Sequence, residues 1–370
     1  METKKGKIKI AQVVGNAKTG GVISCVINFY RNIDRDKFVF HFYTYGESPY
    51  DGEIRRLGGE VFYIPSVLNF PKSVSQMVKY FKNGGYAAVH AHLTTLSVVP
   101  LFTARLAGVK TRICHAHSTS HKTEKVRIVK NALRPFSRLF PTHIAGCSRY
   151  SCEWLYGKRK GEQAFLLRNA IDLSRFCPDA ENSQRLKAEY GLSGRKVIGC
   201  VGRFVFQKNI PFLVEAFAML GLADKNAVLV LVGDGKERPL IEERIRRFNL
   251  EGRVIILPEI PDVEKYYALF DLFALPSRFE GLPLVAVEAQ AMGIPCLLSD
   301  EITPEVNITG QCEFLPIDSP GEWADKMGEI LGAAQKYDLR DRISDAGYDI
   351  KKEAKRLEEF YLSTGERNGY

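Results

Sequence analysis

The sequence predicts an α/β protein built from two doubly wound domains, each with a largely parallel sheet. Its 370 residues are enough for two domains of ordinary size. Short apolar runs typical of buried strands alternate with helix-periodic segments over residues 1–173, and a second such series follows over 174–345. A polar stretch that contains Pro178 joins the two series at residues 168–179 and suits a hinge.

The apolar runs give the order of the strands. In the first series they predict strands at residues 8–14, 38–43, 61–64, 87–91, 111–115 and 143–145. Helical periodicity between them predicts helices at residues 22–31, 74–82 and 96–106. In the second series we expect strands at residues 197–201, 227–232, 254–257, 272–275 and 295–298, with helices between them. Residues 336–361 are periodic and highly charged, which predicts a closing helix over 346–370.

The composition is typical of a globular protein in the cytoplasm. Hydrophobic residues make up 45% of the chain and charged residues 26%. No apolar run reaches the ~20 residues that a membrane-spanning helix needs. The first residues, METKKGKIKIAQVV, are interrupted by charge and lack a small-residue cleavage site, so we expect a strand rather than a leader. The eight cysteines form no C-x-x-C pair, which predicts buried, reduced thiols.

The net charge of +9 is unevenly distributed along the chain. Residues 1–172 carry 27 Lys and Arg against 11 Asp and Glu, a net charge of +16, whereas the remainder carries 25 against 32, a net charge of −7. Such asymmetry predicts an anionic partner for the first half. Nucleic acid, a membrane surface and a phosphate-bearing substrate all meet that description.

One segment, KTEKVRIVKNALRPFSRLF at residues 122–140, has the character of a partner-binding helix. Apolar side chains recur between basic ones, and Pro135 predicts a kink or break. An ordinary solvated helix face over a core stripe explains this pattern, and so does peripheral docking on an anionic membrane surface or a lipid phosphate at the inner face of the membrane. The basic residues are Lys122, Lys125, Arg127, Lys130, Arg134 and Arg138.

The clearest site pattern is LPSRFEGLPLVAVEAQAM at residues 275–292. An apolar strand ends at a proline, a polar turn follows, and a helix is predicted from Leu282 with Pro283 in its first turn. A helix start at the carboxyl end of a strand presents free N–H groups that suit a phosphate. Glu280 before the helix and Glu288 within it suit sugar hydroxyls, because a carboxylate accepts several hydrogen bonds. A salt-bridged helix acid and a solvated loop acid are the plainer explanation, but two acids around a strand-turn-helix favour a sugar-nucleotide site.

The first strand of each series is followed by a loop that could contact phosphate. In the second series, VGRFVFQKN places Arg203 and Lys208 just past a strand end, where two cations can clamp a diphosphate. In the first series, GNAKTGGV places Gly20 and Gly21 at a helix start, where glycines let a ligand approach the backbone. The dinucleotide fingerprint G-x-G-x-x-G is absent there, so an ordinary tight turn explains this loop equally.

Two histidine pairs follow strands of the first series: His90 with His92, and His115 with His117. H-x-H spacing on a strand puts both rings on one face, so a metal site has to be considered. No Asp, Glu or Cys cluster with ligand spacing accompanies the histidines, so we expect no metal. A core histidine, or one at a strand end where α/β folds bind ligands, is the more common case.

Taken in order along the chain, these pieces resemble glycosyltransferase family 4. The matching pieces are the early GG loop, VHAH, the strand-end His117, NAID and RF at the linker, VGRFVFQKN, LVGDG, and EGLPLVAVE, the last being the E-x7-E motif of that family. They span nearly the whole chain, and the sequence is similar in style to bacterial enzymes of capsular and exopolysaccharide assembly. The resemblance implies the GT-B fold, in which two Rossmann-like domains face each other across a cleft and the closing helix packs back on the N-terminal domain.

The resemblance also implies an activity and a set of site residues. The reaction would be retaining transfer from a nucleotide-diphosphate sugar, such as a UDP-sugar, to a glycan or lipid-phosphate-linked acceptor, without a metal or other cofactor. Carried over position by position, Glu280 would hold the hydroxyls of the donor sugar and Glu288 the ribose diol. Arg203 and Lys208 would bind the diphosphate, and His117 would lie near the reacting carbon.

Backbone groups complete the implied donor site. The amides of Gly281 and Leu282, with Pro283 opening the helix, would lie against the sugar and the phosphates. Gly20 and Gly21 would approach the diphosphate from the first domain.

Two other classes of protein were weighed against this one. A basic nucleic-acid-binding protein would explain the charge of residues 1–172, but the basic segment lacks an aromatic stacking platform and the second half stays unexplained, so no nucleic-acid partner is expected. A non-catalytic sugar-nucleotide-binding subunit could lose Glu280, Arg203 or Lys208, and all three are present. Among enzymes, an epimerase or a phosphorylase on the same fold would differ in its products.

Overall fold

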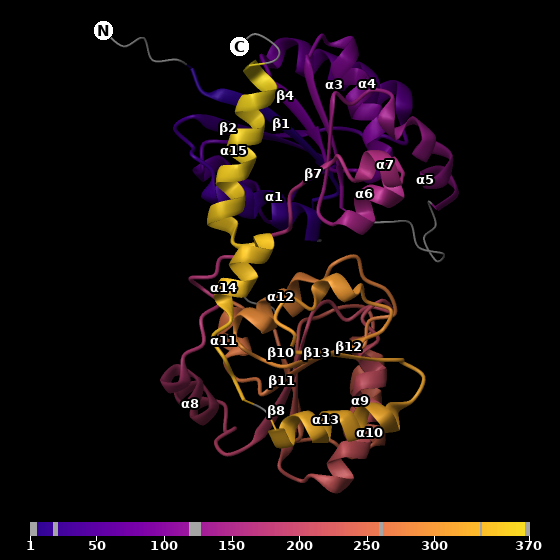
Figure 1. Ribbon diagram of the computed structural model, residues 1–370. Helices are drawn as coiled ribbons and strands as arrows, with labels where there is room; N and C mark the ends of the chain where they lie inside the picture. Colours follow the sequence, from indigo (N-terminus) through magenta and orange to yellow (C-terminus); the bar gives the residue numbers. More distant parts are fainter. Residues whose placement is uncertain (1–5, 18–20, 118–126, 259–261, 334, 367–370) are drawn as a thin grey trace. The chain divides into compact units, whose positions relative to one another are not determined.

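The structure is a computed structural model that describes residues 6–17, 21–117, 127–258, 262–333 and 335–366. The chain divides into two compact units (Figure 1). Unit 1 consists of Met1–Ala170 and Ile350–Tyr370, and unit 2 of Ile171–Asp349. The expected divisions, after residues 173 and 345, stand a few residues from these.

Unit 1 is built on a seven-stranded sheet in the order β3-β2-β1-β4-β5-β6-β7. Every neighbouring pair of strands is parallel. The direction of the strand order changes between β1 and β4, the kind of position where open α/β sheets bind ligands. The strands are β1 (Ile8–Gly15), β2 (Phe38–Thr44), β3 (Glu60–Tyr63), β4 (Ala88–Ala91), β5 (Thr111–Ala116), β6 (His143–Gly146) and β7 (Phe165–Leu166).

Helices cover both faces of this sheet. On one face, α1 (Gly21–Asn32) and α15 (Ile350–Glu366) share a core with the phenylalanines of β2. On the other face lie α3 (Phe70–Gly84), α4 (Val98–Leu106) and α6 (Arg149–Tyr156). The shorter elements of the unit are α2 (Asp51–Arg56), α5 (Arg127–Leu133), α7 (Lys158–Gly161) and the 3-10 turns η1 (Thr94–Ser97) and η2 (Arg134–Arg138).

The last helix of the chain is part of the core of unit 1. Tyr361 of α15 is buried, and its ring centroid lies 6.0 Å from that of Phe38 and 6.1 Å from that of Phe40. Leu357 and Ala354 are buried in the same cluster. The apolar stripe of α15 therefore closes the face that α1 covers only in part.

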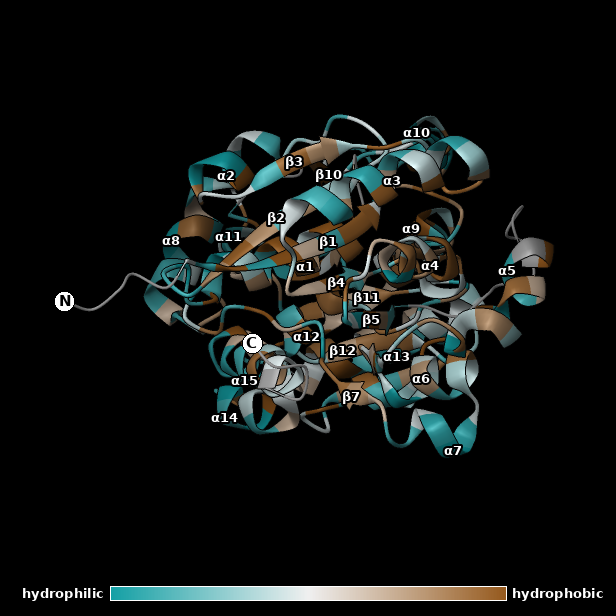
Figure 2. Ribbon diagram, turned by 90° about the horizontal axis from the view of Figure 1, so that it is seen from above, coloured by the Kyte–Doolittle hydropathy of each residue, from teal (hydrophilic) through white to brown (hydrophobic). Residues whose placement is uncertain are grey.

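Unit 2 is built on a six-stranded parallel sheet in the order β10-β9-β8-β11-β12-β13. Its strands are β8 (Lys196–Val201), β9 (Ala227–Val232), β10 (Val254–Leu257), β11 (Leu272–Leu275), β12 (Cys296–Ser299) and β13 (Cys312–Leu315). Every residue of β9 and β11 is buried, as expected for parallel strands covered on both faces. Figure 2 shows the hydrophobic colour along β11 and, in unit 1, along β1.

The helices of unit 2 follow its strands in alternation. The strand order changes direction between β8 and β11, so the loops after these two strands meet at one edge of the sheet. The helical elements are α8 (Ala180–Glu189), α9 (Ile210–Ala223), α10 (Arg238–Arg247), α11 (Glu264–Tyr267), α12 (Leu284–Ala291), η3 (Pro304–Val306), α13 (Pro320–Ala333), α14 (Arg340–Ile343) and the π-helical turn η4 (Ser344–Tyr348).

The predicted fold class is confirmed, and each predicted strand forms with ends shifted by at most one residue. Two short edge strands, β7 and β13, have no counterpart in the prediction. The predicted helix from Leu282 starts later, at Leu284, because Pro283 keeps an extended backbone with ψ of 110° and serves as its N-cap. The predicted closing helix is interrupted at Gly347, whose φ of 85° is left-handed, and α15 begins at Ile350.

Two expectations from composition can be compared with the structure. All eight cysteines are free thiols, and seven of them are buried. Among the described residues, no helix is both long and apolar enough to cross a membrane.

Candidate active site

The loop between β8 and α9 is held tightly against the loop after β9. Gly202 N donates to Val232 O at 3.0 Å, and Phe204 N donates to Asp234 O at 2.8 Å. Gly202 and Gly233 have φ values of 151° and 143°, and a Cβ on Gly233 would lie 2.1 Å from the carbonyl oxygen of Gly202. The backbone contact therefore requires glycine, and it fixes the loop that carries Arg203 and Lys208.

Lys208 and Glu280 form an ion pair between the loops that follow β8 and β11. Lys208 Nζ lies 2.7 Å from Glu280 Oε1, and only 14% and 10% of the two side chains are exposed. Ser277 Oγ donates to the same carboxylate at 3.0 Å, and Gln207 Nε2 donates to its other oxygen at 3.1 Å. Because the pair is largely shielded from water, its geometry is more strongly fixed than that of a surface salt bridge.

Main-chain contacts hold the same two loops together. Arg278 N donates to Gln207 O at 2.8 Å, and Gln207 Nε2 also donates to Phe279 O at 3.0 Å. The Arg278 guanidinium donates to Asn209 Oδ1 at 2.7 Å and lies 4.5 Å from the centroid of the Phe206 ring. The carboxylate of Glu280 is thus positioned by a preorganised frame rather than by a flexible loop.

The turn after Glu280 leads directly into α12. Gly281 and Leu282 are half-buried, Pro283 is buried, and the helix begins at Leu284. The first N–H groups of a helix have no intrahelical acceptor, so this end can bind a negatively charged group.

Glu288 lies in the second turn of α12 and is bonded to Tyr267 of α11. Tyr267 Oη donates to Glu288 Oε2 at 2.7 Å. The carboxyl group is desolvated although the residue keeps some exposed surface, and burial raises its pKa to about 7. Burial and the neighbouring Glu288 also raise the pKa of Tyr267 well above its ordinary value, so the phenol keeps its proton and remains a donor.

Arg203 differs from the other candidates in this unit. Its side chain is exposed, and it makes no hydrogen bond or ion pair with any residue that the structure describes. Its loop nevertheless also carries Lys208. The structure thus brings Lys208 and Glu280 into contact and places Glu288 in the second turn of the helix that follows Glu280. The Arg203 side chain is exposed to solvent.

Sequence reasoning missed the residues that hold this frame. Gln207, Ser277 and Tyr267 contact the two acids directly. Gln207 precedes Lys208 in the sequence, and Ser277 lies in the turn before Glu280. Their closeness to the two motifs could have identified them. Tyr267 lies on another helix, and no local pattern pointed to it.

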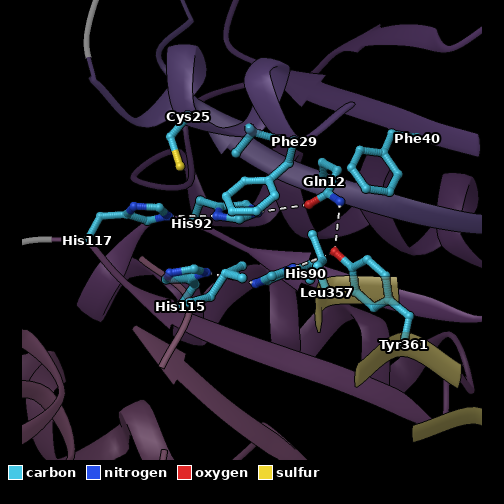
Figure 3. A pocket seen from close by; sticks show the side chains of 12 residues that line it. Gln12, Cys25, Phe29, Phe40, His90, His92, His115, His117, Leu357 and Tyr361 are labelled. Carbon is cyan, nitrogen blue, oxygen red and sulfur yellow. Dashed lines mark hydrogen bonds between the residues drawn. The ribbon is translucent and has the colours of Figure 1, made fainter. Parts of the chain in front are cut away.

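Unit 1 contains a buried cluster of four histidines at the end of β4 and β5 (Figure 3). The rings of His90 and His92 lie 4.2 Å apart and those of His115 and His117 lie 4.1 Å apart, which confirms that each H-x-H pair shares a face. His92 Nδ1 bonds His117 Nε2 at 2.8 Å, and His90 Nε2 bonds His115 Nδ1 at 3.1 Å. Strand-paired β4 and β5 therefore place the four rings in two hydrogen-bonded pairs.

The cluster is electrically neutral. Burial lowers the pKa of His117 to about 3 and those of the other three well below their ordinary value. Ligand atoms of His90, His92 and His115 lie within 4.8 Å of one another, the spacing of a potential metal site. The inner nitrogens are engaged in hydrogen bonds between rings, so hydrogen bonding alone explains the arrangement.

Some of the remaining sequence-predicted residues lie outside the described residues, namely Gly20, Lys122 and Lys125. Gly21 begins α1, and no atom of the described residues lies within 4 Å of a Cβ built on it. Arg127 begins α5, and Lys130 is half-buried on the same helix. Arg134 lies 5.2 Å from the centroid of the Trp154 ring. The break predicted at Pro135 is confirmed, because α5 ends at Leu133 and a 3-10 turn follows.

Comparisons with known proteins agree with one another. Residues 195–333 match the family described as glycosyl transferases group 1. The putative glycosyltransferase EpsF of Bacillus subtilis strain 168 is 35% identical to this chain, over 97% of this chain and 98% of its own length. The UDP-Gal:alpha-D-GlcNAc-diphosphoundecaprenol alpha-1,3-galactosyltransferase of Escherichia coli is 26% identical over 81% of each chain.

A solved structure shares the fold. The crystal structure of Anabaena Alr3699/HepE in complex with UDP-glucose matches with a TM-score of 0.78 and 18% identity, over 96% of this chain and 100% of the other. At that level of identity the likeness establishes the two Rossmann-like units and no substrate.

Proposed function

The chain is a member of the group 1 glycosyltransferases, and we propose that it is a retaining enzyme that moves a sugar from a UDP-sugar to a glycan or lipid-phosphate-linked acceptor in cell-surface polysaccharide synthesis. The observation that carries this proposal is the shielded Lys208–Glu280 pair at the carboxyl edge of the unit 2 sheet, directly before the start of α12. A cation, an acid and a helix start in one place suit a ligand in which a sugar is joined to a diphosphate.

The ion pair has bonding capacity left for such a ligand. An ammonium group has three protons, and Lys208 has one contact with Glu280, so the other protons can reach a phosphate oxygen. A carboxylate offers about four lone-pair positions, and Glu280 uses three of them for Lys208, Ser277 and Gln207. One position remains for a sugar hydroxyl, and replacement of the Lys208 contact by a phosphate contact would free another.

In the proposed reaction the difficult charge is the one on the departing diphosphate. Lys208 and the amides at Gly281, Leu282 and the start of α12 would stabilise it, and the exposed guanidinium of Arg203 would add a fork to the phosphate oxygens. Preorganised electrostatic groups of this kind are usually the largest catalytic contribution. The leaving phosphate oxygen would accept the proton of the acceptor hydroxyl on the face from which the new bond forms, which gives retention.

Glu288 would bind the ribose of the nucleotide. A carboxylate beside a donating phenol can accept from both hydroxyls of a vicinal diol, while Tyr267 fixes its orientation. The proposal assigns Glu280 to the transferred sugar and Glu288 to the nucleoside, so the two acids of the E-x7-E motif have separate tasks. Arg203 and Lys208 bind the diphosphate between them.

In unit 1, the proposal assigns His117 to the sugar near its reacting carbon and Gly20 with Gly21 to the diphosphate. His117 has one buried ring nitrogen, Nδ1, without a partner among the described residues. A neutral imidazole nitrogen can bond a hydroxyl group, which supports a sugar ligand rather than an anion.

The acceptor side is proposed to dock on an anionic membrane surface through residues 122–140. Three apolar side chains on this segment are exposed: Ile128 at 83%, Phe136 at 51% and Leu139 at 59%. Such side chains, on a segment whose sequence also carries Arg134 and the other basic residues, fit the interface of a lipid layer better than open water. The cytoplasmic face of the membrane, where a lipid-phosphate-linked acceptor would sit, would then be the place of reaction.

A donor screen tests the proposal. The full chain is incubated with a panel of UDP-, GDP- and ADP-sugars together with lipid-diphosphate-linked sugars, and the released nucleotide and the extended acceptor are both measured. We expect nucleotide release that depends on the acceptor with one or more UDP-sugars. Isomerised donor without transfer would identify an epimerase, and consumption of inorganic phosphate would identify a phosphorylase.

A further inference from the structure

Two ring nitrogens of the histidine cluster are buried and have no partner among the described residues: His115 Nε2 and His117 Nδ1. The two residues are 1% and 8% exposed. Both line a cavity of about 10 Å³, which is close to the smallest space that holds a water molecule. Their rings are stacked at an interplanar angle of 13°. Because buried polar atoms are nearly always bonded, these two nitrogens indicate a place for a polar group.

A continuous chain of hydrogen bonds connects these two rings (Figure 3). It passes through both strands, through β1 and through the closing helix α15. From one end to the other, the bonds are His117 Nε2 to His92 Nδ1 (2.8 Å), His92 Nε2 to Gln12 Oε1 (2.8 Å), Gln12 Nε2 to Tyr361 Oη (3.0 Å), Tyr361 Oη to His90 Nδ1 (2.8 Å) and His90 Nε2 to His115 Nδ1 (3.1 Å).

The Gln12 amide determines where the protons lie on the first branch. A neutral imidazole carries one N–H and one bare nitrogen, so each bond fixes the state of the next ring. Gln12 Oε1 accepts, so His92 must donate from Nε2 and its Nδ1 is bare. His117 must then donate to that bare nitrogen from Nε2, which leaves His117 Nδ1 as a bare acceptor.

The second branch follows from the other end of the same amide. Gln12 Nε2 donates to the Tyr361 hydroxyl, whose own proton goes to His90 Nδ1. His90 must then donate from Nε2 to His115 Nδ1, which leaves the proton of His115 on Nε2. All four rings therefore share the Nε2–H tautomer, and reversal of the amide would move all four to Nδ1–H. In either state, one unpartnered nitrogen is an acceptor and the other is a donor.

We propose that Gln12 is a positioning residue that sets the tautomer of His117 through His92 and couples it to that of His115 through Tyr361 and His90. The unpartnered nitrogens, on two stacked rings whose centroids lie 4.1 Å apart at the same cavity, then offer one acceptor and one donor, the pairing that a hydroxyl group requires. This role rests on the proposed function, in which His117 contacts the transferred sugar. A hydroxyl of that sugar is the ligand, and a water molecule takes its place in the free enzyme.

The tautomers can be measured directly on the full chain labelled with ¹⁵N-histidine, by long-range ¹H–¹⁵N correlation at pH 8.5. Signals are assigned by single histidine substitutions. In the wild type we expect all four rings to be neutral and in one common tautomer. Opposite tautomers for His115 and His117 would overturn the coupling.

Gln12→Glu is the decisive variant, because a carboxylate accepts at both ends. His92 and His117 should keep Nε2–H, whereas Tyr361 now donates to position 12 and His90 and His115 should change to Nδ1–H. Retention of one common tautomer by all four rings would overturn the role of Gln12. His41 is the internal control: it is buried and bonded to Tyr86 Oη at 2.9 Å, outside this chain of bonds, so its signals should not move.

A second variant covers the case in which Gln12→Glu does not fold. Tyr361→Phe removes the hydroxyl that joins the two branches, so His90 and His115 should show mixed tautomers while His92 and His117 keep theirs. An unchanged common tautomer in this variant would count against the coupling. Addition of equimolar Zn²⁺ should leave the wild-type signals unchanged. A shift of the His90, His92 and His115 signals would mean that these rings form a metal site and would overturn the proposed role of the hydrogen-bond chain.

Activity separates this inference from the proposed function. Gln12→Glu removes the donor from the pair of unpartnered nitrogens, so kcat for sugar transfer should fall about tenfold with little change in KM for the donor. If, in Gln12→Glu, His92 and His117 carry Nε2–H while His90 and His115 carry Nδ1–H, as expected, but kcat stays at the wild-type value, Gln12 sets the tautomers but has no role in transfer. If all four rings of Gln12→Glu share one tautomer, Gln12 does not set the tautomers, whatever the activity.

Discussion

Lys208 Nζ lies 2.7 Å from Glu280 Oε1, and this contact joins the loop after β8 to the loop after β11. The motifs in the sequence assign the two residues to different parts of a ligand, the diphosphate and the sugar. In the structure the two residues are paired within a frame supplied by Gln207 and Ser277. The Lys208–Glu280 pair would thus bind the ligand where its sugar joins its diphosphate. Loss of either charge would leave the charge of the other residue uncompensated.

Glu280→Gln and Arg203→Ala should separate the two tasks of the site. Glu280→Gln removes the charge that acts on the sugar, so turnover should fall on the order of 100-fold. The affinity for free UDP should not fall, because Lys208 loses a competing carboxylate and keeps its charge for the diphosphate. Arg203→Ala should weaken UDP binding and turnover together. Steady-state kinetics and calorimetry measure the two effects, and Arg185→Ala provides an exposed arginine elsewhere on unit 2 as a control. Wild-type turnover in Glu280→Gln would remove this residue from the sugar site.

Glu288 should make donor binding depend on pH. Its pKa is raised to about 7, so below pH 7 the carboxyl group is protonated and offers the ribose diol a poorer acceptor. The affinity for a UDP-sugar, whose phosphate diesters do not titrate in this range, should therefore increase as the pH rises from 6 to 8.

Variants of Glu288 check that this dependence comes from the one carboxyl group. Glu288→Gln should abolish the rise in affinity between pH 6 and 8. Glu288→Ala should weaken binding at pH 8 by roughly tenfold to a hundredfold, the value of a lost hydrogen bond to a charged group, about 1.5–3 kcal/mol. Titration calorimetry at both pH values gives the answer, and a pH dependence that survives in Glu288→Gln would assign it to another group.

Sugar transfer should persist in an excess of chelator. Lys208 supplies positive charge at Glu280, just before the start of α12, and Arg203 lies on the same loop as Lys208. No D-x-D pair follows the carboxyl end of a strand in the sequence. Initial rates with EDTA, and with EDTA plus added Mg²⁺ or Mn²⁺, measure the effect. Activity that disappears with EDTA and returns with a divalent metal would contradict the metal-free mechanism.

The segment at residues 122–140 should bind anionic vesicles. Each basic residue near such a surface contributes about 1 kcal/mol, and the contact should weaken with salt because the Debye length is ~8 Å at physiological ionic strength. In sedimentation with anionic and neutral vesicles, Lys125→Glu/Lys130→Glu/Arg134→Glu should lose most of the binding to anionic vesicles.

A matched variant separates this segment from overall charge. Lys351→Glu/Lys352→Glu/Lys355→Glu makes the same change of charge on α15, which covers the other face of the unit 1 sheet. It should retain most of the binding. Equal losses in the two variants would mean that net charge alone is responsible, and equal binding to neutral vesicles would rule out the electrostatic contact.

Local patterns were sufficient for most of the fold. The central strands are continuous apolar runs bounded by turns, so their positions could be read directly, as for β9 and β11. The edge strand β7 has two residues, and only one of the four residues of β13 is buried, which leaves too weak a pattern to detect. Gly347 interrupts the closing segment because its left-handed backbone ends a helix that periodicity alone would continue.

The site shows the same division between local and distant information. Lys208, Glu280 and Glu288 were recognisable because each stands at a fixed offset from a strand end. Tyr267, which orients Glu288, and Tyr361, which joins the histidine pairs, come from helices that only the tertiary fold brings near. The Lys208–Glu280 contact belongs to this second group, since each residue was visible in the sequence and their pairing was not.

A retaining mechanism determines the anomeric configuration of the first-formed product. The full chain is incubated with the UDP-sugar and acceptor found in the screen, and the anomeric signal of the new linkage is followed by ¹H NMR from the first minutes of reaction. We expect a linkage with the same anomeric configuration as the donor, formed by the wild type and strongly reduced in Glu280→Gln. A product of inverted configuration would contradict the retaining mechanism, because inversion requires a base on the opposite face of the sugar rather than the site built around Lys208 and Glu280.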